Sequence, residues 1–323
     1  MTRTDPAHVA ERVLAGDRRA VARAISMVED GSRDLPALSA ALYPKTGRAP
    51  TVGVTGSPGV GKSSLTAELV RVTRSHDQTV AVLAIDPTSP FTGGALLGDR
   101  LRMQAHATDP GVFIRSMATR GHLGGMALAA PEALRVLDAS GKDVIFVETV
   151  GVGQAEVEVA TATDTTLVVV SPGWGDAVQA SKAGILEIAD IFVVNKADKD
   201  GADDAVRDLR NMLRMGPKSD WMPPIVRTST LNGEGLDELW EWIGKHREFQ
   251  EAAGLLEEKR SRRIFDEVKN MVAFRLRERM ANEFGDRLSA DLAARTLDPY
   301  RAAEILLERA GAASEAPAGD SDG

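Results

Sequence analysis

The feature that most constrains this chain is an eight-residue loop, Gly56-Ser57-Pro58-Gly59-Val60-Gly61-Lys62-Ser63. It has the pattern G-x-x-x-x-G-K-[ST], in which backbone N–H groups surround phosphate oxygens. The pattern has this meaning only between a strand and a helix. Here the short apolar run Thr51–Thr55 precedes the loop, and helical spacing of apolar residues follows from Lys62 to Thr73. The sequence therefore predicts a phosphate-binding turn at a helix N-terminus.

The loop residues have distinct predicted roles. Glycines allow backbone N–H groups to turn inward without a Cβ clash. Lys62 is expected to reach the β- and γ-phosphates, and the Ser63 hydroxyl is expected to ligate Mg²⁺. A glycine-rich turn that merely precedes Lys-Ser is the alternative, and the flanking strand and helix disfavour it. The predicted phosphate-binding residues are Gly56, Ser57, Pro58, Gly59, Val60, Gly61, Lys62, Ser63 and Ser64.

A second motif predicts which base is bound. Asn195-Lys196-Ala197-Asp198 has the pattern N-K-x-D and follows the apolar run Ile191–Val194. Ligands of open α/β sheets gather at such carboxyl ends of strands. The Asp198 carboxylate can accept hydrogen bonds from guanine N1–H and N2–H₂, a pair of donors that adenine lacks. We therefore predict GTP or GDP as the ligand. Supporting contacts to the base are expected from Ser229, Thr230 and Leu231 after another strand.

Three acidic residues are candidates for the Mg²⁺ site and for catalysis. Glu148 ends the apolar run Asp143–Val147, where it is expected to hold Mg²⁺ through water, and the Gly151 N–H is expected to bond the γ-phosphate. Asp86 ends another strand, and Asp99 lies in the glycine-rich loop after it. A surface carboxylate at a strand end is the alternative for Glu148, and a plain strand-end turn is the alternative for Asp86. A helix-capping acid is the alternative for Asp99.

One expected catalytic group is missing from its usual position. Many GTPases place a water-orienting Gln directly after the glycine of the second switch. Val152 occupies that position here, and Gln154 lies two residues further on. We therefore predict slow intrinsic hydrolysis that a partner or a dimer contact accelerates. Arginines at 100, 102, 115 and 120 are candidates for transition-state charge, although surface ion pairs are the favoured interpretation of each.

Composition excludes several classes of function. The chain has 323 residues, 43% apolar content, no Cys and a net charge of −8. Without Cys there is no disulfide, thiolate metal site or thiol nucleophile. The negative charge argues against a general nucleic-acid binder. The N-terminus lacks the apolar segment of a signal peptide and no apolar run approaches 18 residues, so we expect a cytoplasmic protein without membrane contact.

The order of apolar runs predicts an α/β fold with a doubly wound, mostly parallel sheet. Residues 1–48 are expected to form an N-terminal helical extension, with one helical stripe ending near Gly31 and a short helix at Leu35–Leu42. Residues 49–250 form the predicted nucleotide domain, 251–311 a hairpin of long helices and 312–323 a disordered tail. The predicted strands are Thr51–Thr55, Thr79–Ile85, Val112–Arg115, Asp143–Val147, Thr165–Val170, Ile191–Val194 and Ile225–Thr228.

With these motifs in place, the chain resembles the MeaB/ArgK family of P-loop GTPases. The resemblance rests on Gly56–Ser64, Ala84–Arg102, Glu148–Glu156, Ser171–Lys182 and Asn195–Asp198. It implies a homodimer through the C-terminal helices. It also implies a chaperone that gates adenosylcobalamin loading onto methylmalonyl-CoA mutase and protects that enzyme, with no tightly held metal or cobalamin in the chaperone itself.

The resemblance also implies roles for individual residues. Ser63, Asp86, Asp99 and Glu148 would form the Mg²⁺ shell, and catalysis would involve Lys62, Asp99, Glu148 and Gly151. Ser171–Lys182 would be a third switch that senses the mutase. Trp174 departs from the small residues common at its position in the family.

Other readings of the same motifs are weaker. A metallochaperone GTPase for another metalloenzyme needs Cys or His ligands, but the chain has no Cys and its five His are scattered. A protein-targeting GTPase needs a Met-rich helical domain, which the sequence lacks. Kinase motifs of the H-R-D and D-F-G type are also missing. A purely structural dimer that binds GTP without turnover stays open.

Overall fold

The computed structural model describes residues 5–87, 106, 108–119, 126–149, 159–173, 187–216, 220–283 and 286–312. The chain divides into two compact units, Met1–Ile264 and Phe265–Gly323. The first contains the sheet and the N-terminal helices, and the second contains C-terminal helices only. The predicted tail beyond Ala312 lies outside the described residues.

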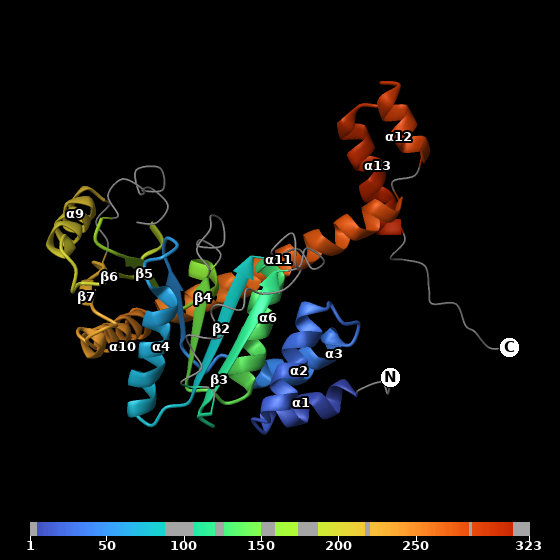
Figure 1. Ribbon diagram of the computed structural model, residues 1–323. Coiled ribbons are helices and arrows are strands. Elements are labelled where there is room, and N and C mark those ends of the chain that lie inside the picture. Colours follow the sequence, from blue (N-terminus) through green and yellow to red (C-terminus); the bar gives the residue numbers. More distant parts are fainter. Residues whose placement is uncertain are drawn as a thin grey trace. The chain divides into compact units, whose positions relative to one another are not determined.

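The first unit is built around a seven-stranded sheet of order β3-β2-β4-β1-β5-β6-β7 (Figure 1). Every ladder between neighbouring strands is parallel, so the predicted α/β fold is confirmed. All seven predicted strands are present, three with their predicted bounds and four with shifted ends. The strands are β1 (Thr51–Thr55), β2 (Val80–Pro87), β3 (Val112–Thr119), β4 (Val144–Thr149), β5 (Thr165–Val170), β6 (Ile191–Asn195) and β7 (Ile225–Thr228).

The strand order brings the predicted motifs to one edge of the sheet. The chain leaves β1 towards β2 on one side and later crosses from β4 to β5 on the other, which makes the carboxyl end of β1 a topological switch point. The register pairs Val54 of β1 with Glu148 of β4, and Asn195 of β6 with Thr228 of β7. Ligand-binding loops are expected at this edge.

Helices cover both faces of the sheet. One face carries α4 (Lys62–Ser75) and α10 (Leu236–Ala252), and the other carries α6 (Met126–Ala139) with the N-terminal helices packed against it (Figure 1). Helix α9 (Ala202–Met215) packs beside β6 and β7. The strands are buried on both faces, which explains their continuous apolar runs.

The N-terminal extension differs from the single helical stripe predicted from its apolar spacing. It forms α1 (Pro6–Leu14), α2 (Arg18–Glu29) and α3 (Leu35–Leu42), the last with its predicted bounds. The stripe breaks at Gly16, which has φ +73°, and at Asp17, whose carboxylate accepts from the Arg19 and Ala20 N–H groups. A helix start at Asp17 therefore favours two helices over one long helix.

The C-terminal helices also differ from the predicted hairpin of long helices. Helix α11 (Leu255–Glu283) is long, whereas α12 (Asp286–Ala293) and α13 (Pro299–Ala312) are short. The Asp298 carboxylate accepts from the Tyr300 and Arg301 N–H groups, and Pro299 occupies the first turn of α13. Within the described residues, no helix has the length and apolar content that crossing a membrane requires.

A buried polar cluster lies at the amino end of the sheet, opposite the predicted nucleotide edge. The His246 ring on α10 contacts Thr165 Oγ1 through Nδ1 at 2.9 Å and Asp190 Oδ1 through Nε2 at 3.3 Å. Burial lowers the pKa of His246, and this effect outweighs the opposing influence of Asp190, while Lys259 lowers the pKa further and Asp164 raises it. The neutral ring is therefore the form that the folded chain favours.

This cluster predicts a pH dependence of stability. The unfolded His246 titrates near pH 6.5, above its pKa in the folded chain, so the unfolded state binds more protons as pH falls below about 6.5. The free energy of unfolding is fully present above that pH and decreases on acidification towards the folded pKa. Urea titrations at pH 7.5 and 5.5, followed by tryptophan fluorescence, should show this loss. The His246→Gln variant should lose less, and an equal loss in both proteins would contradict the prediction.

Candidate functional site

The phosphate loop connects β1 to α4, as its sequence context predicts. Gly56 has φ +140°, and a Cβ atom there would collide with the Val169 carbonyl oxygen. Gly61 has φ +97°, and a Cβ atom there would lie 2.5 Å from Asn195 Nδ2. Both positions therefore require glycine, because left-handed backbone and close neighbours exclude a side chain.

The Lys62 side chain lies within this loop. It is buried, and its Nζ donates to the Gly56 carbonyl at 2.6 Å and to the Ser57 carbonyl at 3.1 Å. These contacts hold an ammonium group next to the backbone that the motif assigns to phosphates. Phosphate oxygens are stronger acceptors for an ammonium group than neutral carbonyls are. The arrangement suits a lysine that binds phosphate with a short movement.

The structure brings together two of the predicted Mg²⁺ ligands. The Ser63 hydroxyl, at the start of α4, donates to Glu148 Oε1 at the end of β4. Glu148 is only 3% exposed, so it is not a surface carboxylate at a strand end. A hydroxyl and a carboxylate are hard oxygen ligands, the kind that Mg²⁺ prefers. The pair links the phosphate loop to the strand that precedes the predicted second switch.

The other predicted catalytic positions are placed less completely. Asp86 lies in β2, two residues beyond Ala84, which pairs with Glu148, so its backbone reaches the same edge of the sheet. The Asp86 side chain lies outside the part of the structure that is described. Asp99, Gly151, Val152, Gln154, Trp174 and Lys182 lie outside the described residues, as do Arg100, Arg102 and Arg120. Arg115 pairs with Glu29 and donates to Ser26 Oγ on α2, which confirms the ion-pair interpretation.

The predicted guanine loop is tied to the phosphate loop. Asn195 is fully buried, and its Nδ2 donates to the Val60 carbonyl at 2.9 Å. Lys196, which has φ +58°, donates through Nζ to the Gly59 carbonyl at 2.6 Å. Asn195 and Lys196 therefore act as a bridge between two loops that are distant in the sequence.

Sequence reasoning placed Thr228 only in a loop near the base and missed its contact with Asn195. The Thr228 hydroxyl at the end of β7 donates to Asn195 Oδ1 at 3.2 Å and so fixes which way the Asn195 amide faces. Thr228 and Asn195 are cross-strand partners in the β6–β7 ladder. This signal exists only in the register, which a single sequence does not reveal.

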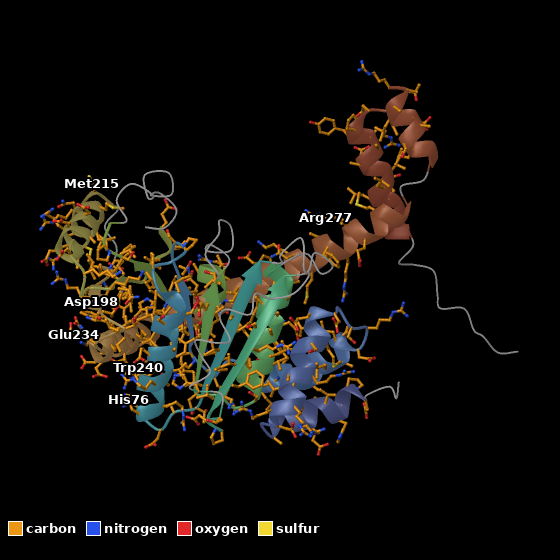
Figure 2. The ribbon with its side chains drawn as sticks, viewed as in Figure 1. His76, Asp198, Met215, Glu234, Trp240 and Arg277 are labelled. Carbon is orange, nitrogen blue, oxygen red and sulfur yellow. The ribbon has the colours of Figure 1, made fainter. Side chains whose placement is uncertain are left out.

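Asp198 is held as an ionised acceptor. The Ser229 hydroxyl donates to Asp198 Oδ1 at 2.6 Å, and this hydrogen bond is the main reason that the pKa of Asp198 is lowered. Ser229 also forms an isolated antiparallel β-bridge, a backbone pairing, with Glu234. Figure 2 labels both Glu234 and Asp198. The contact of Ser229 is thus with the carboxylate, whereas the sequence predicted only a loop near the base. Thr230 and Leu231 follow in the turn, and Leu231 is 83% exposed.

Comparisons with known proteins agree with this geometry. The family model described as "Methylmalonyl Co-A mutase-associated GTPase MeaB" matches residues 21–284. The chain belongs to the MeaB family. A putative GTPase of Pyrococcus horikoshii is 51% identical over 306 residues, which cover 93% of this chain and 96% of that protein. The GTPase ArgK of Escherichia coli is 36% identical over 287 residues, covering 85% and 86%.

Two further matches bear on the architecture of the MeaB family. The crystal structure titled "LAO/AO transport system kinase" matches with a TM-score of 0.72 and 28% identity, covering 95% of this chain and 98% of that one. A protein named fused isobutyryl-CoA mutase, from Cupriavidus metallidurans, is 38% identical over 244 residues. Those residues cover 72% of this chain and 22% of the fused protein. The chain is a P-loop GTPase of the MeaB family.

Proposed function

We propose that this MeaB-family GTPase is a chaperone of an adenosylcobalamin-dependent acyl-CoA mutase. It would gate adenosylcobalamin loading onto methylmalonyl-CoA mutase and protect that enzyme from inactivation. The fused relative carries the proposal, because it is named a mutase and contains a segment that matches 72% of this chain. A GTPase that acts on a mutase gains a high effective concentration from such a fusion.

The proposed nucleotide site contains residues that fit a magnesium ion. Ser63 Oγ and Glu148 Oε1 supply hard oxygen atoms at the phosphate loop, Ser63 as a direct ligand and Glu148 through water. Asp86 and Asp99 complete the proposed shell by their place in the sequence. The described residues contain no group of three or more His, Cys, Asp or Glu that suits a tightly held metal without nucleotide. Bound Mg²⁺ would neutralise charge on the phosphates.

Residues of the chain itself would then perform the switching. In the proposal, N–H groups of Gly59 and Gly61 and the Lys62 ammonium hold the phosphates, and Asp198 selects guanine. The Gly151 N–H would bond the γ-phosphate and release its segment after hydrolysis. The link from Asn195 to the phosphate loop at Val60 supports this division of labour, since it keeps base and phosphate subsites at a fixed spacing.

The proposal includes a homodimer through the C-terminal helices. Along α11, Phe265, Val268 and Val272 are exposed, Phe265 at 65%. Their spacing places them on one face of the helix. Exposed apolar stripes of this kind favour association with another apolar surface. We propose that a second copy covers this stripe.

Phosphate release tests the chaperone proposal. The chain alone should hydrolyse GTP slowly, well below about 1 s⁻¹, and addition of methylmalonyl-CoA mutase should raise the rate and yield a complex on gel filtration. The Ser63→Ala variant should lose the Mg²⁺-dependent part of the rate in both conditions. An unchanged rate with no complex would rule out the chaperone role. Binding of GTP with no turnover in any condition would instead favour a structural dimer.

A further inference from the structure

The helix that follows the predicted second switch ends in contact with α11. Residues 159–162 are helical, and the beginning of this helix lies outside the described residues. In the sequence, Val159 comes three residues after the end of Glu148–Glu156, the range that contains the predicted second switch. Glu148 in β4 is therefore one described anchor of that segment, and the helix at 159–162, just before β5, is the other. The second anchor helps to set where the switch can lie.

A glycine in β1 lets this helix lie directly on the sheet. A Cβ atom at Gly53 would lie 2.6 Å from Thr163 Oγ1 and 2.7 Å from a methyl carbon of Val159. Both of these residues are fully buried. A side chain at position 53 would therefore push the helix away from β1, because the surrounding core is close-packed. Gly53 thus fixes how closely the helix approaches the strand that leads into the phosphate loop.

Arg263 of α11 holds the C-terminal end of the same helix. Its Nε donates to the Thr161 carbonyl at 3.0 Å, and its Nη2 donates to Asp164 Oδ1 at 3.1 Å. The last four carbonyl groups of an α-helix have no partner within the helix. Arg263 supplies a partner for one of them, and a positive charge is favourable at this end of a helix.

Asp164 connects this helix end to the beginning of β1. The Thr51 N–H donates to Asp164 Oδ2 at 3.1 Å, and the Asp164 N–H lies 2.9 Å from the Thr51 carbonyl oxygen that accepts from it. Lys259 Nζ, also on α11, donates to the Asp164 carbonyl at 2.8 Å. The end of the helix is therefore held by β1 and by the first turns of α11, all within the first unit.

We propose that Arg263 is a positioning residue for GTP hydrolysis. Its partner Asp164 directly precedes β5, whereas the phosphate loop follows the carboxyl end of β1, so Arg263 acts through an intervening element. That element is the helix at 159–162, whose placement determines how Gly151 of the second switch meets the γ-phosphate. A displacement of about 1 Å far from the reacting atoms can slow a reaction about a hundredfold. The inference rests on the proposed role of the second switch but not on the chaperone role.

Single-turnover GTP hydrolysis by the full chain, without a mutase, tests this role. Arg263→Met removes both contacts of Arg263 and leaves Arg260 on the Asp164 carboxylate. It should lower the first-order rate constant about three- to tenfold, while GDP affinity stays unchanged. Arg262→Met is the matched control, because Arg262 is the preceding residue of α11 and pairs with the exposed Glu258. That variant should hydrolyse GTP at the original rate.

The rate constant separates positioning from stability. It counts only chain that has bound GTP, and every variant would be measured at a temperature at which it is fully folded. A contact that only stabilised the fold would lower Tm and leave this rate constant unchanged. Gly53→Ala displaces the same helix from the side of β1, so it should also slow hydrolysis without loss of GDP affinity.

A further variant separates this inference from the proposed switch. Gly151→Pro lacks the N–H that would bond the γ-phosphate, so it should slow hydrolysis. Slow hydrolysis by Gly151→Pro together with the original rate constant in Arg263→Met or Gly53→Ala would overturn the positioning role alone. An equal fall in Arg262→Met would overturn it as well. The original rate constant in Gly151→Pro would instead overturn the proposed role of the second switch, and the positioning role with it.

Discussion

Replacing Asp198 with Asn is expected to lower GDP affinity by at least about a hundredfold and to create affinity for xanthosine diphosphate. In the proposed site the carboxylate would accept two hydrogen bonds from guanine, and each charge-assisted bond contributes about 1.5–3 kcal/mol. The Asn amide replaces one acceptor oxygen with an NH₂ donor. That donor faces guanine N2–H₂ unfavourably but suits the C2 carbonyl of xanthine. The Ser229 hydroxyl still holds the other oxygen, so the geometry should persist.

Competition with a fluorescent nucleotide measures both affinities in one assay. Asp200→Asn is the matched control, because Asp200 is an exposed acid near the same loop and has no proposed contact with the base. That variant should bind GDP like the original chain. If Asp198→Asn retained full GDP affinity without gaining affinity for the xanthine nucleotide, Asp198 would not be the guanine-selecting group.

The Asp164→Ala variant should lose about 3–5 kcal/mol of stability, the usual effect of removing one member of a buried ion pair. Asp164 Oδ2 accepts from Arg260 at 2.8 Å, and Oδ1 accepts from Arg263 at 3.1 Å. The Thr51 N–H also donates to this carboxylate, at the start of β1. Removal of the carboxylate leaves two partly buried guanidinium groups and a backbone donor without their acceptor. The first turns of α11 should then detach from the sheet.

Lowering the pH should reveal the contribution of the Asp164 carboxylate to stability. Burial alone would raise the pKa of Asp164, but the hydrogen bond from Arg260 and the charge of Arg263 outweigh it, and the net pKa is lowered. The stabilisation is therefore present above the unfolded pKa, near 3.9, and is lost as pH falls through the lower folded value.

For the Asp164→Ala variant, differential scanning calorimetry would show the loss of stability as a fall of roughly 10 °C in the Tm of the first unit. Asp204→Ala is the control, since Asp204 forms an exposed ion pair with Arg207 and its removal should cost less than about 1 kcal/mol. The Asp164→Ala/Arg263→Met double variant should recover part of the lost stability, because it removes one uncompensated charge. A Tm equal to that of Asp204→Ala would show that the cluster contributes nothing.

Local patterns predicted the strands well, because each is buried on both faces and reads as a continuous apolar run. They failed where a single residue decides between two alternatives. The apolar spacing on both sides of Gly16 suits one helix equally well, but the left-handed backbone there and the cap at Asp17 divide it into two. A sequence shows both the apolar spacing, which suits one helix, and the potential cap, which suits two. The packing of α1 against α2 determines that two helices form.

The sequence by itself determined the chemistry of the site. The phosphate loop and the guanine motif are each one unbroken run of residues, and the function of each depends on backbone geometry over a few positions. Only the tertiary structure decided how these parts meet. Asn195 reaches Val60 across 135 positions, Thr228 orients Asn195 through strand register, and Ser63 meets Glu148 because β4 lies beside β1. Each of these contacts depends on strand order and register, which arise from the packing of the whole sheet and leave no local pattern in the chain.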